Sequence, residues 1–249
     1  MRVKAARQTT RARLGAIAWA TGMALSSQVA MASPAATPTE TPPLRTSAGT
    51  GAAPAEARRA DFGSYRPSAS ARELADWVVA TGDHRGRPFI VVDKVGARVI
   101  AFDADGRLRG TSPALLGLAR GDHSVPGIGE RPIASIRPEE RTTPAGRFDA
   151  EMGRNANGED ILWVDYDNAV SMHRVRATNP AEQRLRRLAS ATVSDNRISY
   201  GCINLPAAFY DGVVKALFSP RNGVVYVLPE TRSAGQVFGL TGAVRTVRR

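Results

Sequence analysis

Two runs of β-branched and aromatic residues around a tight turn constrain most strongly what this chain can fold into. The first run is Pro88–Asp93 and the second is Ala97–Phe102, with the turn Lys94–Gly96 between them. Short apolar runs bounded by turn residues are typical of strands, and this spacing predicts a β-hairpin. Asp103–Gly106 is a second turn signal, so a third strand is expected over Arg107–Thr111. This part of the chain is therefore expected to be sheet.

Further strands are expected in the second half of the chain, each beside a turn. Thr142–Gly146 combines a proline that fixes φ with a glycine that can take positive φ, so it predicts a turn. The alternating segment Arg147–Met152 follows as a strand, and similar patterns predict strands over 161–166, 169–173 and 224–228. We therefore predict a mainly β fold with helical additions, of the α+β class, over residues 65–231.

Three helices are expected among these strands. Ser70–Glu73 has the pattern of a capping box, and the helix that it begins is expected to run to Thr81. Asn179 followed by proline predicts the start of a second helix, Asn179–Thr192, which carries a basic face. Pro206 suits the first turn of a third helix, because a missing N–H costs nothing there. Its apolar residues over 207–218 recur at helical spacing.

The first 32 residues have the features of a secretory signal peptide. Basic residues precede the apolar segment Leu14–Val29, and Ala30–Ala32 is a small-residue cleavage signal. The alternative is a retained anchor, which polar residues in that segment disfavour because a membrane span needs about 20 mainly apolar residues. Residues 33–64 are expected to be a disordered spacer and 232–249 a basic tail. We expect export to the periplasm or cell envelope, with no stable membrane span after signal cleavage.

The chain is strongly basic, with a formal net charge of +11. Removal of residues 1–32, which carry five cationic and no acidic side chains, lowers this charge to +6. A basic exported protein is attracted to anionic polymers of the envelope or to lipid surfaces. Nucleic acid is disfavoured as a partner, because the sequence has no basic motif interleaved with aromatic residues. The sequence leaves the oligomeric state open.

Cys202 is the only cysteine of the 249 residues, so it cannot form a disulfide within the chain. In an exported protein such a thiol is buried as a small apolar side chain, paired with another chain or used in chemistry. The polar, glycine-containing turn Ser199–Gly201 just before it favours use in chemistry. A helix beginning near Pro206 would offer unpaired N–H groups and a positive dipole end. These would lower the thiol pKa and could receive an oxyanion.

Thiol chemistry needs a base, and the sequence offers three histidines. His84 follows the first helix and is interpreted as a solvated surface residue. His123 lies in a glycine-rich loop, where it would line a cleft or face water. His173 ends the strand 169–173, and a strand end is a place where a sheet can hold a side chain over a cleft. We favour His173 as the base. No paired Cys or His spacing indicates a metal site, and no metal or other cofactor is expected.

The segment Ser199–Asn204 resembles the nucleophile motif of the L,D-transpeptidase family, the YkuD-like catalytic domain. His173 matches the upstream histidine that ends a strand in that family. Thr142–Phe148 is similar to its Thr-Pro-x-Gly-x-Phe turn, and the hairpin Phe89–Phe102 resembles its opening strands. The resemblance spans about residues 87–229. It implies a β-sandwich with a cysteine turn leading into a helix.

Two departures from the family pattern stand out. Tyr200 lies where most members have histidine, which puts the substrate contacts there in question. His173 and Cys202 are 29 positions apart, more than is common in the family. The helix expected over Asn179–Thr192 would fill the extra length as a flap beside the cleft.

The resemblance implies a peptidoglycan L,D-transpeptidase. In that mechanism Cys202 forms a thioester with a stem tetrapeptide, and His173 acts as general base and then general acid. Backbone N–H groups near Gly201 and Cys202 would hold the oxyanion, and the other oxyanion and substrate contacts are Ser199, Tyr200 and Asn204. The partners would be peptidoglycan stem peptides, and the acyl group would pass to an amine acceptor. Two alternatives stay open, a hydrolytic L,D-carboxypeptidase and a wall-binding domain without turnover. A papain-like peptidase is disfavoured because its cysteine precedes its histidine.

Overall fold

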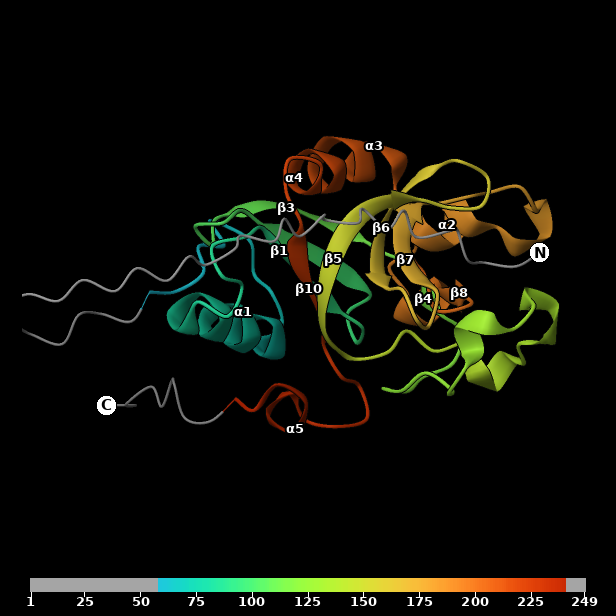
Figure 1. Ribbon diagram of the computed structural model, residues 1–249, viewed down its shortest axis with the longest axis horizontal. Helices are drawn as coiled ribbons and strands as arrows, with labels where there is room; N and C mark the ends of the chain where they lie inside the picture. The colour runs from blue at the N-terminus through green and yellow to red at the C-terminus, as the bar shows by residue number, and fades with distance from the viewer. Residues whose placement is uncertain (1–57, 241–249) are drawn as a thin grey trace, which may run out of the picture. The chain divides into compact units, whose positions relative to one another are not determined.

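An eight-stranded mixed sheet organises the computed structural model, which describes residues 58–240 (Figure 1). The strand order is β3-β2-β1-β10-β5-β6-β7-β9, and β4 pairs with β8 in a second, two-stranded sheet. The strands are β1 Phe89–Asp93, β2 Arg98–Phe102, β3 Leu108–Pro113, β4 Leu116–Gly117, β5 Gly146–Arg154, β6 Asp160–Asp165, β7 Val170–Arg174, β8 Arg197–Ser199, β9 Ile203–Leu205 and β10 Gly223–Val227. The mainly β class predicted from the sequence is confirmed.

The hairpin predicted at the start of the sheet is confirmed. Strands β1 and β2 pair antiparallel, with Phe89 opposite Phe102 and Asp93 opposite Arg98. The last strand, β10, inserts between β1 and β5, parallel to the first and antiparallel to the second. Side chains alternate across β1, so Phe89 and Val91 face one side of the sheet while Ile90 and Val92 face the other. Both faces are therefore buried.

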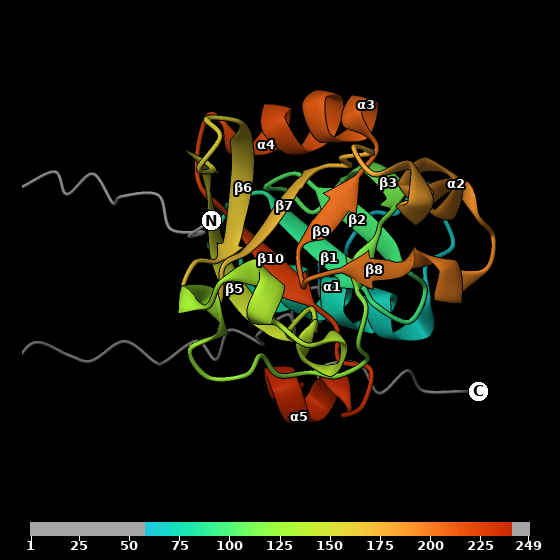
Figure 2. The ribbon, with the colours of Figure 1, turned by 90° about the vertical axis from the view of Figure 1, so that its right-hand side faces the viewer.

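Helices cover the two faces of the sheet (Figure 2). Helix α1, Ala69–Thr81, packs on β1, β2 and β10 through residues such as Leu74 and Val78. The other face is covered by a continuous helical segment made of α3 Ala207–Phe209, a π-helical stretch Tyr210–Lys215 and α4 Ala216–Phe218. The third predicted helix is thus present, with a wider turn in its middle.

The sheet curls so far that its two edges almost meet. The backbone of Leu115, just after β3, forms a bridge to Asn204 of β9, with both N–H to carbonyl distances at 2.9 Å. Val92 and Val99 of the opening hairpin share one core with Ile203 of β9, which lies at the other end of the strand order. The architecture is therefore a nearly closed barrel or sandwich whose edge strand leads directly from the cysteine turn.

Two of the predicted helix boundaries are wrong. Helix α1 begins at Ala69, and its N-cap is Ser68, whose Oγ accepts a hydrogen bond from the Ala71 N–H at 3.2 Å. The predicted helix Asn179–Thr192 is broken in two. A 3-10 turn Pro180–Glu182 is followed by Gln183 at φ 49°, and only then does α2, Arg184–Ala189, begin. One residue in the left-handed region is enough to end the first turn and redirect the chain.

Residues on both sides of the predicted domain, 65–231, pack against its core. Ala60 and Phe62, expected in the spacer, are buried, and Asp61 bridges to Arg107. Within the predicted basic tail, α5 runs over Ala234–Phe238 and packs against the core. The predicted signal peptide 1–32, most of the spacer and residues 241–249 lie outside the described residues. Among the described residues, no helix has the length and apolar character of a membrane span.

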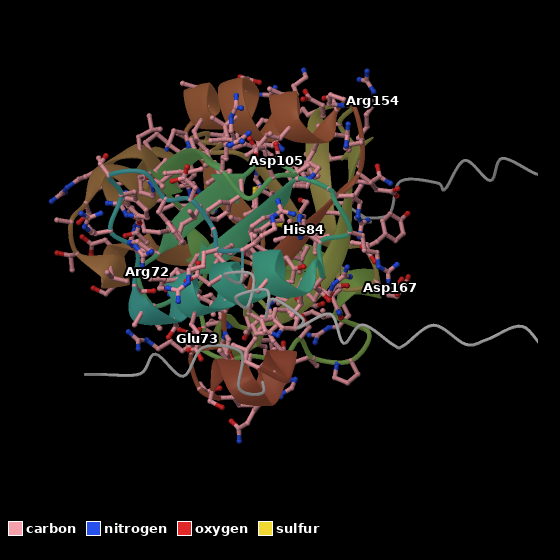
Figure 3. The ribbon with its side chains drawn as sticks, turned by 90° about the vertical axis from the view of Figure 1, so that its left-hand side faces the viewer. Arg72, Glu73, His84, Asp105, Arg154 and Asp167 are labelled. Atoms are coloured by element: carbon pink, nitrogen blue, oxygen red, sulfur yellow. The ribbon has the colours of Figure 1, made fainter. Side chains whose placement is uncertain are left out.

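One histidine that was interpreted as a surface residue is buried. His84 is 4% exposed, and its ring nitrogens lie 3.2 Å from the carbonyl oxygen of Val78 and 3.0 Å from that of Ala104. The surface interpretation of His84 is therefore wrong. This histidine fastens the end of α1 to the turn after β2, whereas Arg72 and Glu73 on the same helix are exposed (Figure 3).

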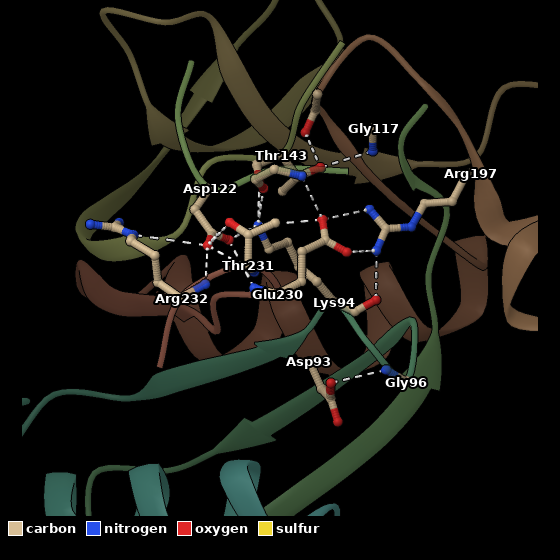
Figure 4. A network of polar contacts seen from close by, with 12 residues as sticks. Asp93, Lys94, Gly96, Gly117, Asp122, Thr143, Arg197, Glu230, Thr231 and Arg232 are labelled. Atoms are coloured by element: carbon tan, nitrogen blue, oxygen red, sulfur yellow. Dashed lines mark hydrogen bonds and ion pairs between the residues drawn. The ribbon is translucent and has the colours of Figure 1, made fainter. Parts of the chain in front are cut away.

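Lys94, in the hairpin turn, has no exposed surface. Its Nζ donates to Asp122 Oδ1 at 2.9 Å and to the carbonyl oxygen of Thr143 at 3.0 Å, and it lies 3.7 Å from Glu230 (Figure 4). Arg197 at the start of β8 pairs with the same Glu230 at 2.6 Å. A buried charge is tolerated only when it is paired and hydrogen-bonded. These four charged residues, Lys94, Asp122, Arg197 and Glu230, are called the buried ionic cluster below.

Candidate active site

The parallel pairing of β7 with β9 brings His173 and the cysteine turn together. In this register His173 lies opposite Asn204, and Cys202 comes just before the first residue of β9. Cys202 and His173 both line one cavity with a volume of about 500 Å³. Both side chains are partly buried. The structure therefore brings together the two residues that the sequence suggested as nucleophile and base, while exposed His123 and buried His84 do not line this cavity.

The imidazole of His173 is oriented by the main chain. Its Nδ1 lies 2.8 Å from the carbonyl oxygen of Arg174, which can only accept a hydrogen bond. Nδ1 therefore carries the proton in the neutral ring, and Nε2 keeps the lone pair. A base oriented by a backbone carbonyl in this way needs no carboxylate partner.

The thiol is set in polar surroundings at the end of its turn. Cys202 Sγ lies 3.6 Å from Ser171 Oγ and 3.7 Å from the carbonyl oxygen of Ala169. Burial raises the pKa of Cys202, but hydrogen bonding to His173, the charge of that ring and hydrogen bonds from Ser171 outweigh burial and lower the pKa to about 7. Burial lowers the pKa of His173, whereas the interactions with Cys202 and the Arg174 carbonyl raise it overall. The pair favours a thiolate beside an imidazolium.

The helix predicted over residues 207–218 is present, but the short strand β9 lies between it and Cys202. Cys202 leads into β9, and the helical segment begins only at Ala207. The expectation that a helix dipole activates the thiol is therefore wrong in its physical cause. The low pKa comes from His173 and Ser171 instead. Pro206, predicted for the first turn of this helix, is its N-cap residue, directly before that turn.

Ser199 stabilises the cysteine turn by hydrogen bonds, and Gly201 provides the backbone conformation that the turn needs. Ser199 is 2% exposed, and its hydroxyl donates to the Cys202 carbonyl oxygen at 2.6 Å and accepts from the Gly201 N–H at 3.1 Å. Gly201 has φ 128°, which an L side chain rarely adopts. The Gly201 N–H is therefore occupied, so it is not free to serve as one of the oxyanion donors that the family resemblance implies. Within residues 58–240 the Cys202 N–H has no acceptor, and it is the backbone donor left for that role.

Asn204 connects both members of the pair. Its side chain is almost fully buried, and Nδ2 lies 3.4 Å from His173 Nε2 and 3.3 Å from the Cys202 carbonyl oxygen. Its Oδ1 accepts a hydrogen bond from Arg184 at 2.7 Å. Because a guanidinium can only donate, this bond fixes which end of the amide faces the ring. Sequence reasoning missed Arg184. The one available signal was the basic face of the segment that contains it.

Tyr200 and the segment that leads into α2 line the same cavity as Cys202 and His173. Tyr200 is 36% exposed, and the guanidinium carbon of Arg141 stands 3.9 Å from the centre of its ring. The other lining residues include Thr178, Asn179, Glu182 and Arg184. The extra length between His173 and Cys202 thus forms a wall of the pocket, as expected of a flap, although it is not a continuous helix.

Comparisons with known proteins come from structure alone. No protein-family model matches the chain, and neither does the sequence of any curated protein. A solved L,D-transpeptidase in complex with imipenem is 18% identical, with 57% of this chain and 58% of that one covered and a TM-score of 0.32. The catalytic domain of an L,D-transpeptidase from E. faecium is 19% identical, with 57% and 98% covered and a TM-score of 0.30. The fold of this chain is similar to that of L,D-transpeptidase catalytic domains.

A third similar structure is named as a cell shape determining protein and not as an L,D-transpeptidase. The helical cell shape determining protein Pgp2 from Campylobacter jejuni is 14% identical, with 59% of this chain and 49% of that one covered and a TM-score of 0.35. This chain therefore spans about half the length of Pgp2 and 58% of the imipenem-bound protein. We base the functional proposal on the side-chain geometry of the site and on the sequence motif.

Proposed function

We propose that this protein is an exported peptidoglycan L,D-transpeptidase that acts in the cell envelope. The observation that carries the proposal is the pairing of Cys202 with His173 in one cavity, where the thiol pKa is lowered to about 7. A thiolate populated near neutral pH is the form that attacks a carbonyl carbon. The nature of the substrate follows from the resemblance of Ser199–Asn204 and Thr142–Phe148 to the family motifs.

The first half of the reaction forms a thioester. The Cys202 thiolate attacks the carbonyl carbon of the diamino acid in a stem tetrapeptide, and the oxyanion that develops is stabilised by the Cys202 N–H. His173, as imidazolium, gives its Nε2 proton to the leaving nitrogen. The carbon–nitrogen bond breaks, the terminal D-alanine leaves as a neutral amine and the acyl group stays on sulfur. One oxyanion donor contributes about 3 kcal/mol to such a step.

The second half transfers the acyl group. The side-chain amine of a neighbouring stem attacks the thioester carbonyl and loses a proton to His173 Nε2. The carbon–sulfur bond breaks, which regenerates the thiolate and the imidazolium. Water at the same position would give a free tripeptide, so the competition between amine and water decides between a transpeptidase and an L,D-carboxypeptidase.

The products of purified stem tetrapeptides test the proposal. The protein lacking residues 1–32 is incubated with disaccharide tetrapeptides, and the products are separated and weighed by mass spectrometry. We expect cross-linked dimers and free D-alanine, with neither formed by Cys202→Ala. Tripeptide without dimers would support the hydrolytic activity instead. Binding to intact wall without any product, equal in the wild type and Cys202→Ala, would support a wall-binding domain.

A further inference from the structure

The Thr143 hydroxyl contacts the cysteine turn through the carbonyl oxygen of Gly201. Thr143 has no exposed surface, and its Oγ1 lies 2.8 Å from the carbonyl oxygen of Gly201. The same oxygen accepts a hydrogen bond from the Gly117 N–H at 2.9 Å, as Figure 4 shows. Because the Gly117 N–H takes an acceptor site of the hydroxyl, the hydroxyl proton is directed to Gly201. The direction of both hydrogen bonds is thus determined.

The carbonyl that Thr143 holds belongs to the peptide unit that joins Gly201 to Cys202. A peptide unit is planar, and none of the described peptide bonds is cis, so its C=O and its N–H point in opposite directions. Fixing the Gly201 oxygen toward Thr143 therefore fixes the direction of the Cys202 N–H, away from Thr143. That N–H is the donor assigned above to the oxyanion.

Thr143 is itself held in place by the buried ionic cluster. Its carbonyl oxygen accepts a hydrogen bond from Lys94 Nζ at 3.0 Å, and the same Nζ binds Asp122 at 2.9 Å. Arg197, which pairs with Glu230, opens the strand that leads into the cysteine turn. The turn is thus anchored to one buried cluster both through Thr143 and through β8. Because these contacts hold Thr143 in one position, its hydroxyl can orient the Gly201 carbonyl as accurately as an oxyanion site requires.

We propose that Thr143 is a positioning residue that orients the Cys202 N–H as the oxyanion donor, by holding the Gly201 carbonyl at the other end of the same peptide plane. This inference rests on the proposed function only for the identity of the natural acyl donor. The N–H would serve any acyl transfer to Cys202.

Two reactions of the Cys202 thiol, one that forms an oxyanion and one that does not, test whether Thr143 orients the oxyanion donor. Acylation by p-nitrophenyl acetate passes through an oxyanion, because sulfur attacks the carbonyl carbon and p-nitrophenolate leaves as the carbon–oxygen bond breaks. Alkylation by iodoacetamide displaces iodide at a saturated carbon and forms no oxyanion. Both rate constants are measured for the protein lacking residues 1–32 and for Thr143→Val, which keeps the shape and removes the hydroxyl. Thr143→Ser restores the hydroxyl, and Thr142→Val is the matched control on the same turn.

We expect Thr143→Val to lower the acylation rate constant about 10- to 100-fold, since loss of one oxyanion donor typically costs 100- to 1,000-fold. The alkylation rate constant should stay within about twofold, because thiolate formation does not use this N–H. Thr143→Ser should recover most of the acylation rate, and Thr142→Val should change neither rate. If Thr143→Val does not fold, Thr143→Ala, which also removes the hydroxyl, should show the same selective loss.

Equal losses in both reactions, or no loss in acylation, would overturn the proposal. Failure of the proposed function can be distinguished from failure of this inference, because p-nitrophenyl acetate contains neither sugar nor peptide. A selective loss of ester acylation in a protein that never turns over stem peptides would uphold the role of Thr143 and reject the peptidoglycan substrate.

Discussion

Asn204 of β9 lies directly opposite His173 of β7, and its amide nitrogen is 3.4 Å from the Nε2 of that ring. The parallel register of two short strands thus sets where the base stands relative to the nucleophile two residues before Asn204. A slip of one residue would turn either side chain to the other face of the sheet. The site therefore depends on strand pairing as much as on the motif itself.

The reactivity of Cys202 should follow a low pKa that His173 maintains. In the wild type the rate of alkylation by iodoacetamide should rise with pH through a midpoint near 7, where the thiol loses its proton. His173→Gln removes the charge that stabilises the thiolate, so its midpoint should move up toward about 8.5, the value of an ordinary thiol. Stopped-time alkylation between pH 5 and 10 measures both. An unchanged midpoint in His173→Gln would show that His173 does not lower the pKa of Cys202.

Arg184 should support catalysis through Asn204. Arg184→Met removes the donor at 2.7 Å that fixes the Asn204 amide, which is then free to turn away from His173. The side-chain N–H of Asn204 can donate to Nε2 of the neutral ring. Because a small misplacement of a catalytic group can cost about 100-fold, loss of this orientation should lower kcat about tenfold or more. Arg186→Met is the control, because Arg186 is exposed and donates only to Gln183 on its own segment. The kcat values are measured from the steady-state release of D-alanine. Equal values for Arg184→Met and Arg186→Met would contradict a specific role of Arg184.

Gly201 should not tolerate a side chain. A Cβ at this position would lie 2.8 Å from the carbonyl oxygen of Thr142, and φ is 128°. Gly201→Ala must therefore distort the turn, and acylation of Cys202 should fall more than 100-fold because the oxyanion donor moves. Gly158→Ala provides the comparison, with φ 79° and nothing within 4 Å of the added atom. It should cost about 1 kcal/mol of stability and leave acylation unchanged. Ester acylation and thermal unfolding of both variants decide this.

The buried ionic cluster should contribute strongly to folding. Lys94→Met leaves Asp122 and Glu230 buried beside Arg197 without their shared cation, which should lower the free energy of unfolding by about 3 to 5 kcal/mol. Arg107→Met removes the exposed pair with Asp105, whose side chains are 66% and 63% exposed, and should change stability by less than about 0.5 kcal/mol. Urea unfolding curves compare the two. Similar unfolding midpoints for Lys94→Met and Arg107→Met would contradict this prediction, because they would mean that water replaces the contacts of Lys94.

Local structure was predictable where the signals are local. The hairpin Phe89–Phe102 and the helix after Pro206 both appear, because turn residues and apolar spacing act over a few positions. The break of the flap helix at Gln183 was not predictable, since no propensity marks that residue for the left-handed region.

Long-range placement was the part that the sequence did not reveal. The burial of Lys94 depends on Asp122 and Glu230, which are distant in sequence and brought near by the insertion of β10 beside β1. For the same reason the source of the low Cys202 pKa was attributed to a nearby helix, when it lies in His173 across a strand pair. Cys202 and His173 could be named from their motif, whereas Thr143 and Arg184 needed coordinates.

An intact-mass measurement tests most directly the claim that Cys202 and His173 form one acyl-transfer pair. The protein lacking residues 1–32 is mixed with a stem tetrapeptide, quenched in acid at short times and weighed, and the modified residue is located by peptide mapping. The proposed chemistry predicts a covalent tripeptide acyl group on Cys202, formed far more slowly in His173→Gln and absent in Cys202→Ala. A wild-type protein that never gains this mass, or one that gains it on another residue, would contradict it.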